Sequence, residues 1–138
     1  MPVALAASCA MQNPENLRVF EAARETAIAV YLLTARFPLA ERYGLVSQMR
    51  RAAVSVGSNM AEGCGRQGNR ALMAFLHHSL GSLNELDFQA DLAIRLGHCS
   101  DIEAAEVRDK VRLTRRMLAR LLTQLRRRPD HQPQHSPS

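Results

Sequence analysis

A dense run of basic side chains near the end of the chain is the part of the sequence best suited to chemistry. Residues 110–128 contain eight basic side chains and no acidic one. Arginine suits phosphate because its planar guanidinium donates hydrogen bonds to two oxygens of one group at once. The residues that we expect to contact phosphate are Arg108, Arg112, Arg115, Arg116, Arg120, Arg126, Arg127 and Arg128.

The spacing of these arginines predicts a continuous basic ridge on a helix. Four of them recur at every fourth position, namely Arg108, Arg112, Arg116 and Arg120. An alternative is a solvated or subunit-contacting face, because four acids precede the arginines and this distribution complements a helix dipole. The sequence has no aromatic stacking platform and no base-reading motif, so binding of RNA or DNA would be dominated by phosphate and weakened by salt.

A second polar pattern lies in the middle of the chain. Gln48, Arg51, Ser55, Asn59 and Glu62 follow helical spacing on one stripe, which is consistent with a shared site or a hydrogen-bond network. The structural interpretation is favoured: Asn59 and Glu62 would cap a helix or pair with arginines of neighbouring helices or subunits. The glycine-containing turn that follows lacks the lysine and the spacing of a P-loop.

Metal-binding and catalytic patterns are weak in this sequence. His77 and His78 are adjacent, hence about 100° apart on a helix, and are badly placed to bind one metal ion together. The acids Glu85, Asp87 and Asp91 lack the Glu-x-x-His repeat of a bundle metal site. We therefore expect no metal, no cofactor and no enzymatic activity, although a site formed between subunits stays open.

Composition places these residues on a small all-helical domain. The chain has 138 residues, only 4% aromatic side chains, and a net charge of +5. Its three cysteines, Cys9, Cys64 and Cys99, form no C-x-x-C pair, which is typical of a reduced cytoplasmic protein. The apolar residues 1–10 lack the basic start of a signal peptide, and no apolar stretch approaches the roughly 20 residues of a membrane span.

Four helices are predicted from apolar periodicity and from the residues that end helices. The first covers about residues 16–36, the second begins at Leu45 and ends at residues 63–65, the third runs from a cap at Asn69 to Gly97, and the fourth runs from a Ser100–Glu103 capping box to about Arg128. Short connections favour an all-α, antiparallel, up-and-down four-helix bundle over residues 16–128. We expect a flexible segment at 1–15 and a disordered tail at 129–138.

Apolar residues outside the main stripes predict self-association. Val46, Val54, Leu113 and Met117 lie off the stripes that would form the core of a single bundle. A helix that is apolar on more than one side commonly buries the extra face against another subunit. We therefore expect a homo-oligomer.

The centre of the chain also carries a motif of aromatic, polar and glycine residues at fixed spacing. Residues 37–55 are F-P-L-A-E-R-Y-G-L-V-S-Q-M-R-R-A-A-V-S, residues 59–66 are N-M-A-E-G-C-G-R, and residues 80–86 are L-G-S-L-N-E-L. Over about residues 17–125 the chain closely resembles a four-helix bundle family first noticed as proteins encoded in intervening sequences of bacterial large-subunit rRNA genes. It departs from the family pattern at Gly57, Cys64 and Ser79, where proline, an aromatic residue and alanine are usual.

The resemblance implies a left-handed bundle that assembles as a ring-like homopentamer, with no known enzymatic activity. A related bundle, the accessory protein of diversity-generating retroelements, uses a basic pentameric surface to bind a reverse transcriptase and nucleic acid. The motif residues, to which the resemblance gives structural or interface roles, are Tyr43, Gly44, Gln48, Arg50, Arg51, Asn59, Glu62, Gly63 and Arg66.

Together, these observations predict a non-catalytic homo-oligomer that binds RNA or DNA through its fourth helix, with a protein partner as a further expectation. The alternative is a scaffold or adaptor that binds proteins alone and no nucleic acid. These functions differ in their response to salt, because phosphate contacts weaken steeply as salt rises.

Overall fold

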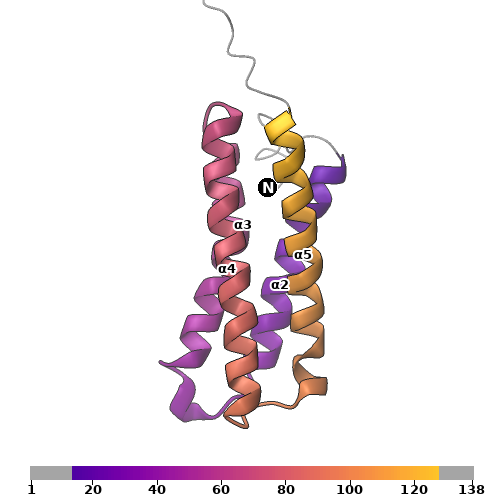
Figure 1. The fold of residues 1–138 in the computed structure, drawn as a ribbon. Helices are drawn as coiled ribbons and strands as arrows, with labels where there is room; N and C mark the ends of the chain where they lie inside the picture. Colours follow the sequence, from indigo (N-terminus) through magenta and orange to yellow (C-terminus); the bar gives the residue numbers. More distant parts are fainter. Residues whose placement is uncertain (1–13, 128–138) are drawn as a thin grey trace, which may run out of the picture.

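The computed structural model describes residues 14–127, which form four long helices (Figure 1). These are α2 (Pro14–Thr34), α3 (Leu45–Cys64), α4 (Asn69–Arg95) and α5 (Asp101–Arg127), with a short 3-10 helix, η2 (Leu39–Glu41), between α2 and α3. Within residues 14–127 there is no strand, so the all-α prediction is confirmed. The predicted disordered tail at 129–138 lies outside the described residues, and so does the predicted flexible segment at 1–15 except for Pro14 and Glu15, which begin α2. The first helix is therefore Pro14–Thr34 and not about 16–36.

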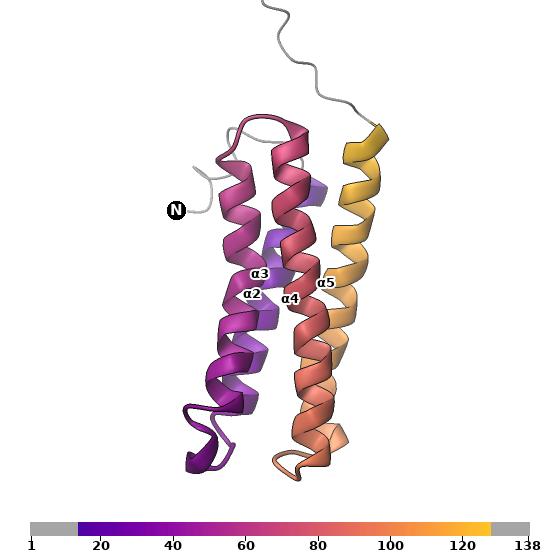
Figure 2. The same cartoon turned by 60° about the vertical axis from the view of Figure 1, so that its left-hand side comes forward.

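The helices lie side by side and alternate in direction along the chain. The connection from α3 to α4 lies at one end of the bundle, and the two other connections lie at the opposite end (Figures 1 and 2). Each helix packs against its neighbours in the sequence, and α5 closes the bundle by packing against α2. This is the expected up-and-down arrangement; its left-handed twist stays a prediction.

The apolar stripes of three helices form the core as the periodicity predicted. Helical spacing predicts an α3 stripe of Leu45, Met49, Ala52, Val56 and Met60, and all five residues are buried. On α4 it predicts two heptad series, Leu72, Ser79, Leu86, Ala93 and Leu76, Leu83, Ala90, Gly97, which are buried as far as Ala93. The α5 series is buried throughout: Val107, Val111, Thr114, Leu118, Leu121 and Leu125. Since a well-packed apolar stripe excludes water from one side of each helix, the charged side chains occupy the outer faces.

Two details of the apolar pattern differ from expectation. On α2, helical spacing predicts a stripe of Phe20, Ala23, Ala27, Tyr31 and Thr34. Four of these residues are buried or packed against the core, but Tyr31 is 43% exposed, and Val19, Val30 and Leu33 complete the core face. Val46, one of the four apolar residues expected to lie outside the core and to favour self-association, is buried within the single chain. The stripes of α2 and α3 are therefore wider than a single heptad seam, because each helix contacts two neighbours at once.

The connection between α4 and α5 is defined by local sequence. Gly97, with φ of +80°, follows α4, and the N–H groups of Gly97 and His98 donate to the carbonyls of Ile94 and Ala93 at 3.0 Å. This is the Schellman arrangement that glycine favours at a helix end. The capping box is also present, as Ser100 N–H donates to Glu103 Oε1 at 2.9 Å and Glu103 N–H to Ser100 Oγ at 3.1 Å.

The start of α4 lies one residue away from the predicted cap. Asn69 is the first residue of the helix, and Gly68 precedes it with φ of +89° and no side-chain cap. Glycine and not asparagine occupies the cap position because a side chain would be strained at this positive φ.

Small residues set the distances between helices. Gly63 is buried against α4, and an added Cβ would lie 3.0 Å from both Leu72 Cδ1 and Phe75 Cβ. Ser79 of α4 donates a hydrogen bond to the carbonyl of Val56 at 2.7 Å. Between α2 and α5, the buried hydroxyls of Thr26 and Thr114 lie 3.0 Å apart. Such contacts fix the register of neighbouring helices because larger side chains do not fit there.

Substituting Gly63 with alanine should destabilise the bundle, whereas the same change at Gly81 should stabilise it. The new Cβ at Gly63 overlaps α4, which we expect to lower the free energy of unfolding by about 1 kcal/mol or more. At Gly81 nothing lies within 4 Å, so alanine should add about 0.5–1 kcal/mol through helix propensity alone. Urea denaturation of both variants measures the difference, and equal effects would contradict the close approach.

Glu103 should make stability depend on acid pH. The hydrogen bond from Ser100 N–H, followed by the Ser100 side chain and the charge of Arg36, lowers the pKa of Glu103. A lowered pKa means that this stabilisation is complete above the unfolded value, about 4.3, and disappears as pH falls through the folded value. The urea midpoint of Glu103→Gln should therefore lie below that of the unsubstituted chain at pH 7 and approach it at about pH 3.

The matched control is Glu106→Gln, which changes an exposed acid one turn later that makes no ion pair with the described residues. The urea midpoint of Glu106→Gln should equal that of the unsubstituted chain at both pH values. If the difference in urea midpoint between Glu103→Gln and the unsubstituted chain grows as the pH falls, the role assigned to Glu103 is wrong.

Candidate nucleic-acid interface

The arginines of α5 point in different directions, so the predicted ridge is not continuous. Four of them, Arg112, Arg116, Arg120 and Arg127, are exposed on the outer face of the helix. At 100° per residue they span an arc of about 80°, opposite the buried stripe. Arg126 is also exposed, at the edge of this arc. Arg128 lies outside the described residues.

Arg108 and Arg115 instead turn toward α4. Arg108 lies 3.4 Å from Asp87 Oδ1 and 3.9 Å from Asp91 Oδ1, and Arg115 lies 3.8 Å from Asp87 Oδ2. Their side chains are only 25% and 33% exposed. Both residues are therefore less available to phosphate than the exposed arginines, because they lie against carboxylates of α4. Asp91 also pairs with Arg95, so three guanidinium groups share two carboxylates there. Residues seven positions apart share a helix face, which is why both meet Asp87.

Lys110 also has a partner in the bundle. Its Nζ lies 3.2 Å from Glu25 Oε2 of α2, and its side chain is 28% exposed. Arg112 keeps an exposed position with Asp109 Oδ1 of its own helix 3.4 Å away. Exposed pairs of this kind contribute little to stability, about 0–1 kcal/mol, and a phosphate competes with them easily.

The arginines without a carboxylate partner gather at the end of α5. Among the described residues, no ion pair is formed by Arg116, Arg120, Arg126 or Arg127, and all four are exposed. We call these four residues, together with Arg112, the α5 basic face. From Arg116 to Arg127 the helix rises on the order of 16 Å, which matches about five steps of nucleic acid at 3.4 Å each.

The motif residues around the start of α3 have structural roles. Glu41 Oε2 accepts a hydrogen bond from the N–H of Leu45 at 2.9 Å, so Glu41 caps α3 across Gly44. An added Cβ at Gly44 would lie 3.1 Å from this carboxylate oxygen. Tyr43 is 87% exposed, and the guanidinium carbon of Arg42 lies 5.6 Å from its ring centroid. A side chain at Gly44 would crowd the carboxylate that caps α3, whereas Tyr43 is presented to solvent.

Arg50 connects α3 to α2. Its Nε donates to Thr34 Oγ1 at 2.9 Å, and its guanidinium carbon lies 4.5 Å from the centroid of the Tyr31 ring. A guanidinium over an aromatic face contributes roughly 0.5–1 kcal/mol at a partly exposed site. The exposed Tyr31 therefore has a structural contact although it lies outside the core.

Within the single chain, the hydrogen bonds of Asn59 and Glu62 are local, and of the polar stripe on α3 it is Ser55 that reaches another helix, through Ser82 of α4. Asn59 Nδ2 donates to the carbonyl of Ser55 at 2.8 Å, and Glu62 accepts from Arg66 at 2.8 Å. Both partners are four residues away in the sequence, so neither Asn59 nor Glu62 bridges to another helix. Gln48 and Arg51 are exposed. Gly63, as described above, is the motif residue that lets α3 and α4 approach.

Two histidines and one serine are the next side chains to consider, because these residue types can bind metal ions or act as nucleophiles. His77 and His78 are exposed, and residues 14–127 contain no group of three or more His, Cys, Asp or Glu side chains placed to hold a metal ion. Ser55 Oγ is hydrogen-bonded to Ser82 Oγ of α4. None of the helices in the described range is long and apolar enough to cross a membrane.

Sequence reasoning missed the counter-charges of the basic helix and one further cation beside it. Asp87 and Asp91 lie far from the arginines in the sequence, and only the packing of α4 against α5 brings them together. Arg18 of α2 lines the same cavity as Arg120 of α5. Neither relation has a local signal, because each depends on how two helices are rotated and aligned.

Comparison with known proteins agrees with this architecture. The model of the family described as "23S rRNA-intervening sequence protein" matches residues 15–120. Among solved structures, the fold is similar to that of a protein of unknown function from the S23 ribosomal protein family of Bacteroides thetaiotaomicron, with a TM-score of 0.68 and 18% sequence identity. The alignment covers 75% of this chain and 97% of that one, and it shows a shared fold. No curated protein matches the chain.

Replacing Arg108 with glutamine should cost stability, whereas replacing Arg116 should not. Arg108→Gln leaves Asp87 and Asp91 without one of their cationic neighbours in a half-buried position, and we expect a loss of about 1 kcal/mol. Arg116→Gln changes an exposed side chain and should stay within about 0.5 kcal/mol of the unsubstituted chain. Urea denaturation at pH 7 compares the two, and equal losses would contradict the division of the α5 arginines.

Proposed function

The chain belongs to the 23S rRNA-intervening sequence protein family, and on that premise we propose that it is a non-catalytic oligomer that binds RNA or DNA phosphates through the α5 basic face. The observation that carries this proposal is the cluster of exposed arginines without carboxylate partners at the end of α5. Arg108, Arg115 and Lys110 are left out of the contact surface because they are half-buried and lie against carboxylates of other helices, which reduces their outward field. Arg112 stays in the contact surface because it is exposed and its partner, Asp109, is an exposed acid of the same helix.

Phosphate is the ligand that this surface favours. The arginines lie on one convex helix face without an aromatic platform, which suits a backbone of repeated charges better than the edges of bases. Because no base-reading group accompanies them, we propose binding with little sequence preference. The affinity should arise mainly from the release of counter-ions and should fall steeply with salt.

Self-association is the second part of the proposal. Several large apolar side chains of the described residues are exposed on the single chain: Ile28 54%, Leu32 67%, Val54 47%, Phe88 67%, Ile102 87% and Leu113 45%. Exposed apolar surface of this kind is typical of subunit interfaces. We propose a homo-oligomer, and the family resemblance favours a pentamer. Repetition of the α5 basic face around a ring would raise the avidity for a long polyanion.

The same apolar side chains support a second candidate function. Phe88 on the outer side of α4 and Val54 on the outer side of α3 are suited to contact a protein partner, as a scaffold or adaptor would. The buried free cysteines Cys64 and Cys99 fit a reducing compartment, so we propose a cytoplasmic location for either function.

Binding to RNA and duplex DNA across a salt series tests the nucleic-acid proposal. The variant replaces Arg112, Arg116 and Arg120 with glutamine together. We expect binding on the order of micromolar at low salt, and the triple change should reduce the slope of log K against log salt by about 2 for each chain in contact with the nucleic acid. Light scattering in the same buffers should give one mass for both proteins.

A matched control removes three positive charges elsewhere. Arg24, Arg66 and Arg95 are exposed and each pairs with a carboxylate three or four residues away. Their joint replacement by glutamine changes the net charge equally and should leave most of the salt slope intact. If neither RNA nor DNA binds at low salt, or if both triple variants lower the slope equally, the proposed interface is wrong, and the scaffold function takes precedence.

A further inference from the structure

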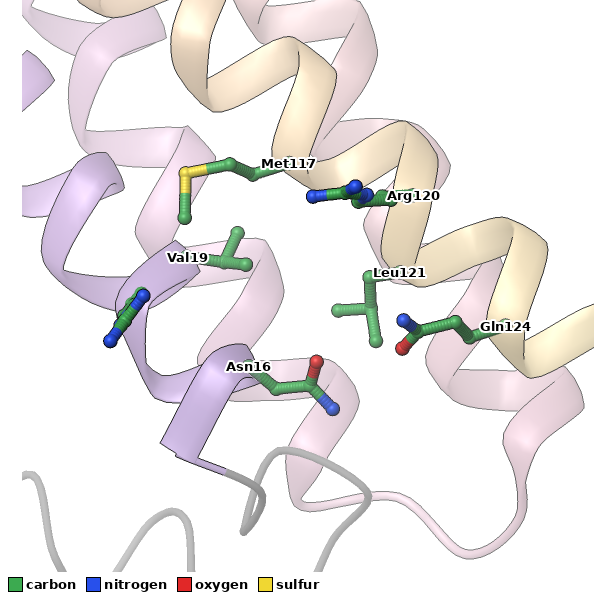
Figure 3. A pocket seen from close by; sticks show the side chains of 7 residues that line it. Asn16, Val19, Met117, Arg120, Leu121 and Gln124 are labelled. Atoms are coloured by element: carbon green, nitrogen blue, oxygen red, sulfur yellow. The ribbon is translucent and has the colours of Figure 1, made fainter.

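A cavity of about 320 Å³ lies between the first turns of α2 and the second half of α5. Asn16, Arg18 and Gln124 contribute polar side chains to its wall, and Arg120 of the α5 basic face does so as well. Figure 3 shows Arg120 extending from α5 toward α2, while the amides of Asn16 and Gln124 approach each other across the lower end. The polar groups of two helices thus converge on one space.

The base of the cavity is apolar. Val19 and Leu121 are 3% and 2% exposed, and the half-buried Met117 lies between the two helices with its sulfur directed toward α2 (Figure 3). A thioether beside aliphatic side chains makes favourable contacts with an aromatic ring. The guanidinium groups of the wall suit an anion, and the half-buried Met117 is the apolar side chain of the lining that can contact a flat ring, because Val19 and Leu121 are almost completely covered by the core.

We propose that this cavity binds a nucleotide that ends in a phosphate monoester, presented as the 5′-phosphate end of a nucleic-acid strand. The proposal rests on the function proposed above, because the strand would continue along the α5 basic face. In this arrangement Arg18 and Arg120 bind the terminal phosphate, and the base of the nucleotide contacts Met117.

The charge of the cavity favours a terminal phosphate over one within a strand. Arg18 and Arg120 come from different helices, both are exposed, and neither forms an ion pair with a carboxylate whose side chain the structure describes. A phosphate monoester carries a charge of about −1.5 to −2 near neutral pH, whereas each phosphate within a strand carries one. Two guanidinium groups balance the monoester more completely, and their mutual repulsion is relieved when it binds.

The size and position of the cavity agree with this ligand. About 320 Å³ is near the lower limit of small-ligand sites, which leaves room for a single nucleotide and none for a duplex. Arg120 belongs both to the cavity and to the α5 basic face. A strand lying along Arg127 and Arg116 would therefore pass the mouth of the cavity and be able to place its end there.

The test compares two short single-stranded RNAs of one sequence, labelled at the 3′ end, that differ only in carrying a 5′-phosphate or a 5′-hydroxyl. We expect the phosphorylated RNA to bind about tenfold more tightly at moderate salt. A difference of this size is typical of charge-assisted hydrogen bonds between a phosphate and arginine. Arg18→Gln should remove this difference while both RNAs still bind. Arg24→Gln, on the same helix but outside the cavity, should preserve the tenfold difference.

Adenosine monophosphate, compared with adenosine, provides an independent measurement by calorimetry and separates the two proposals. Equal binding of the two RNAs, without adenosine monophosphate binding, overturns the cavity proposal and leaves the α5 basic face intact. If neither RNA binds but adenosine monophosphate does, and Arg18→Gln abolishes it, the strand-binding function is wrong and the cavity takes free nucleotides. If no RNA and no adenosine monophosphate binds, both proposals are wrong.

Discussion

Each of the four helices carries an apolar stripe that has to leave water, and the burial of these stripes decides where every other side chain lies. Met49, Leu76, Leu83 and Leu118 are fully buried where the helices meet. Burying one such side chain contributes about 1.5–3 kcal/mol, whereas an exposed ion pair contributes about 0–1 kcal/mol. The core therefore sets the rotation of each helix about its axis, and the charged groups occupy the faces that this rotation leaves outside.

The rotation of α5 divides one basic sequence into groups with different roles. On the side of α4, Arg108 and Arg115 meet Asp87, and on the side of α2, Lys110 meets Glu25. These pairs reinforce the contacts between helices and cancel most of their own outward field. The α5 basic face keeps its charge because the bundle places no carboxylate partner beside Arg116, Arg120, Arg126 or Arg127 within the described residues. A structural role for some arginines and a binding role for others thus follow from one packing arrangement.

The contacts that the family motif makes within the described residues mostly stabilise the bundle. Glu41 caps α3 across Gly44, Arg50 joins α3 to α2, and Gly63 permits the close approach to α4. Six of the nine motif residues are nevertheless exposed, among them Tyr43 and Arg51, and only Gly63 is buried. The functional surface that we propose lies outside the motif, on α5 and the adjoining cavity, because the exposed arginines without carboxylate partners cluster there.

The sequence by itself determined the four helices, their ends to within about two residues and the buried faces of α3, α4 and α5, because these depend on residues within about four positions of one another. The Ser100–Glu103 capping box, the glycine end at Gly97 and the α5 stripe all lie where periodicity placed them. The ends could still shift by one residue, as at Gly68, where backbone conformation outweighed the capping preference of Asn69. Only the tertiary structure decided which arginines are neutralised and that Arg18 and Arg120 share a cavity. Those relations join residues 21 to about 100 positions apart, and they arise from the register and rotation of packed helices, which local spacing does not encode.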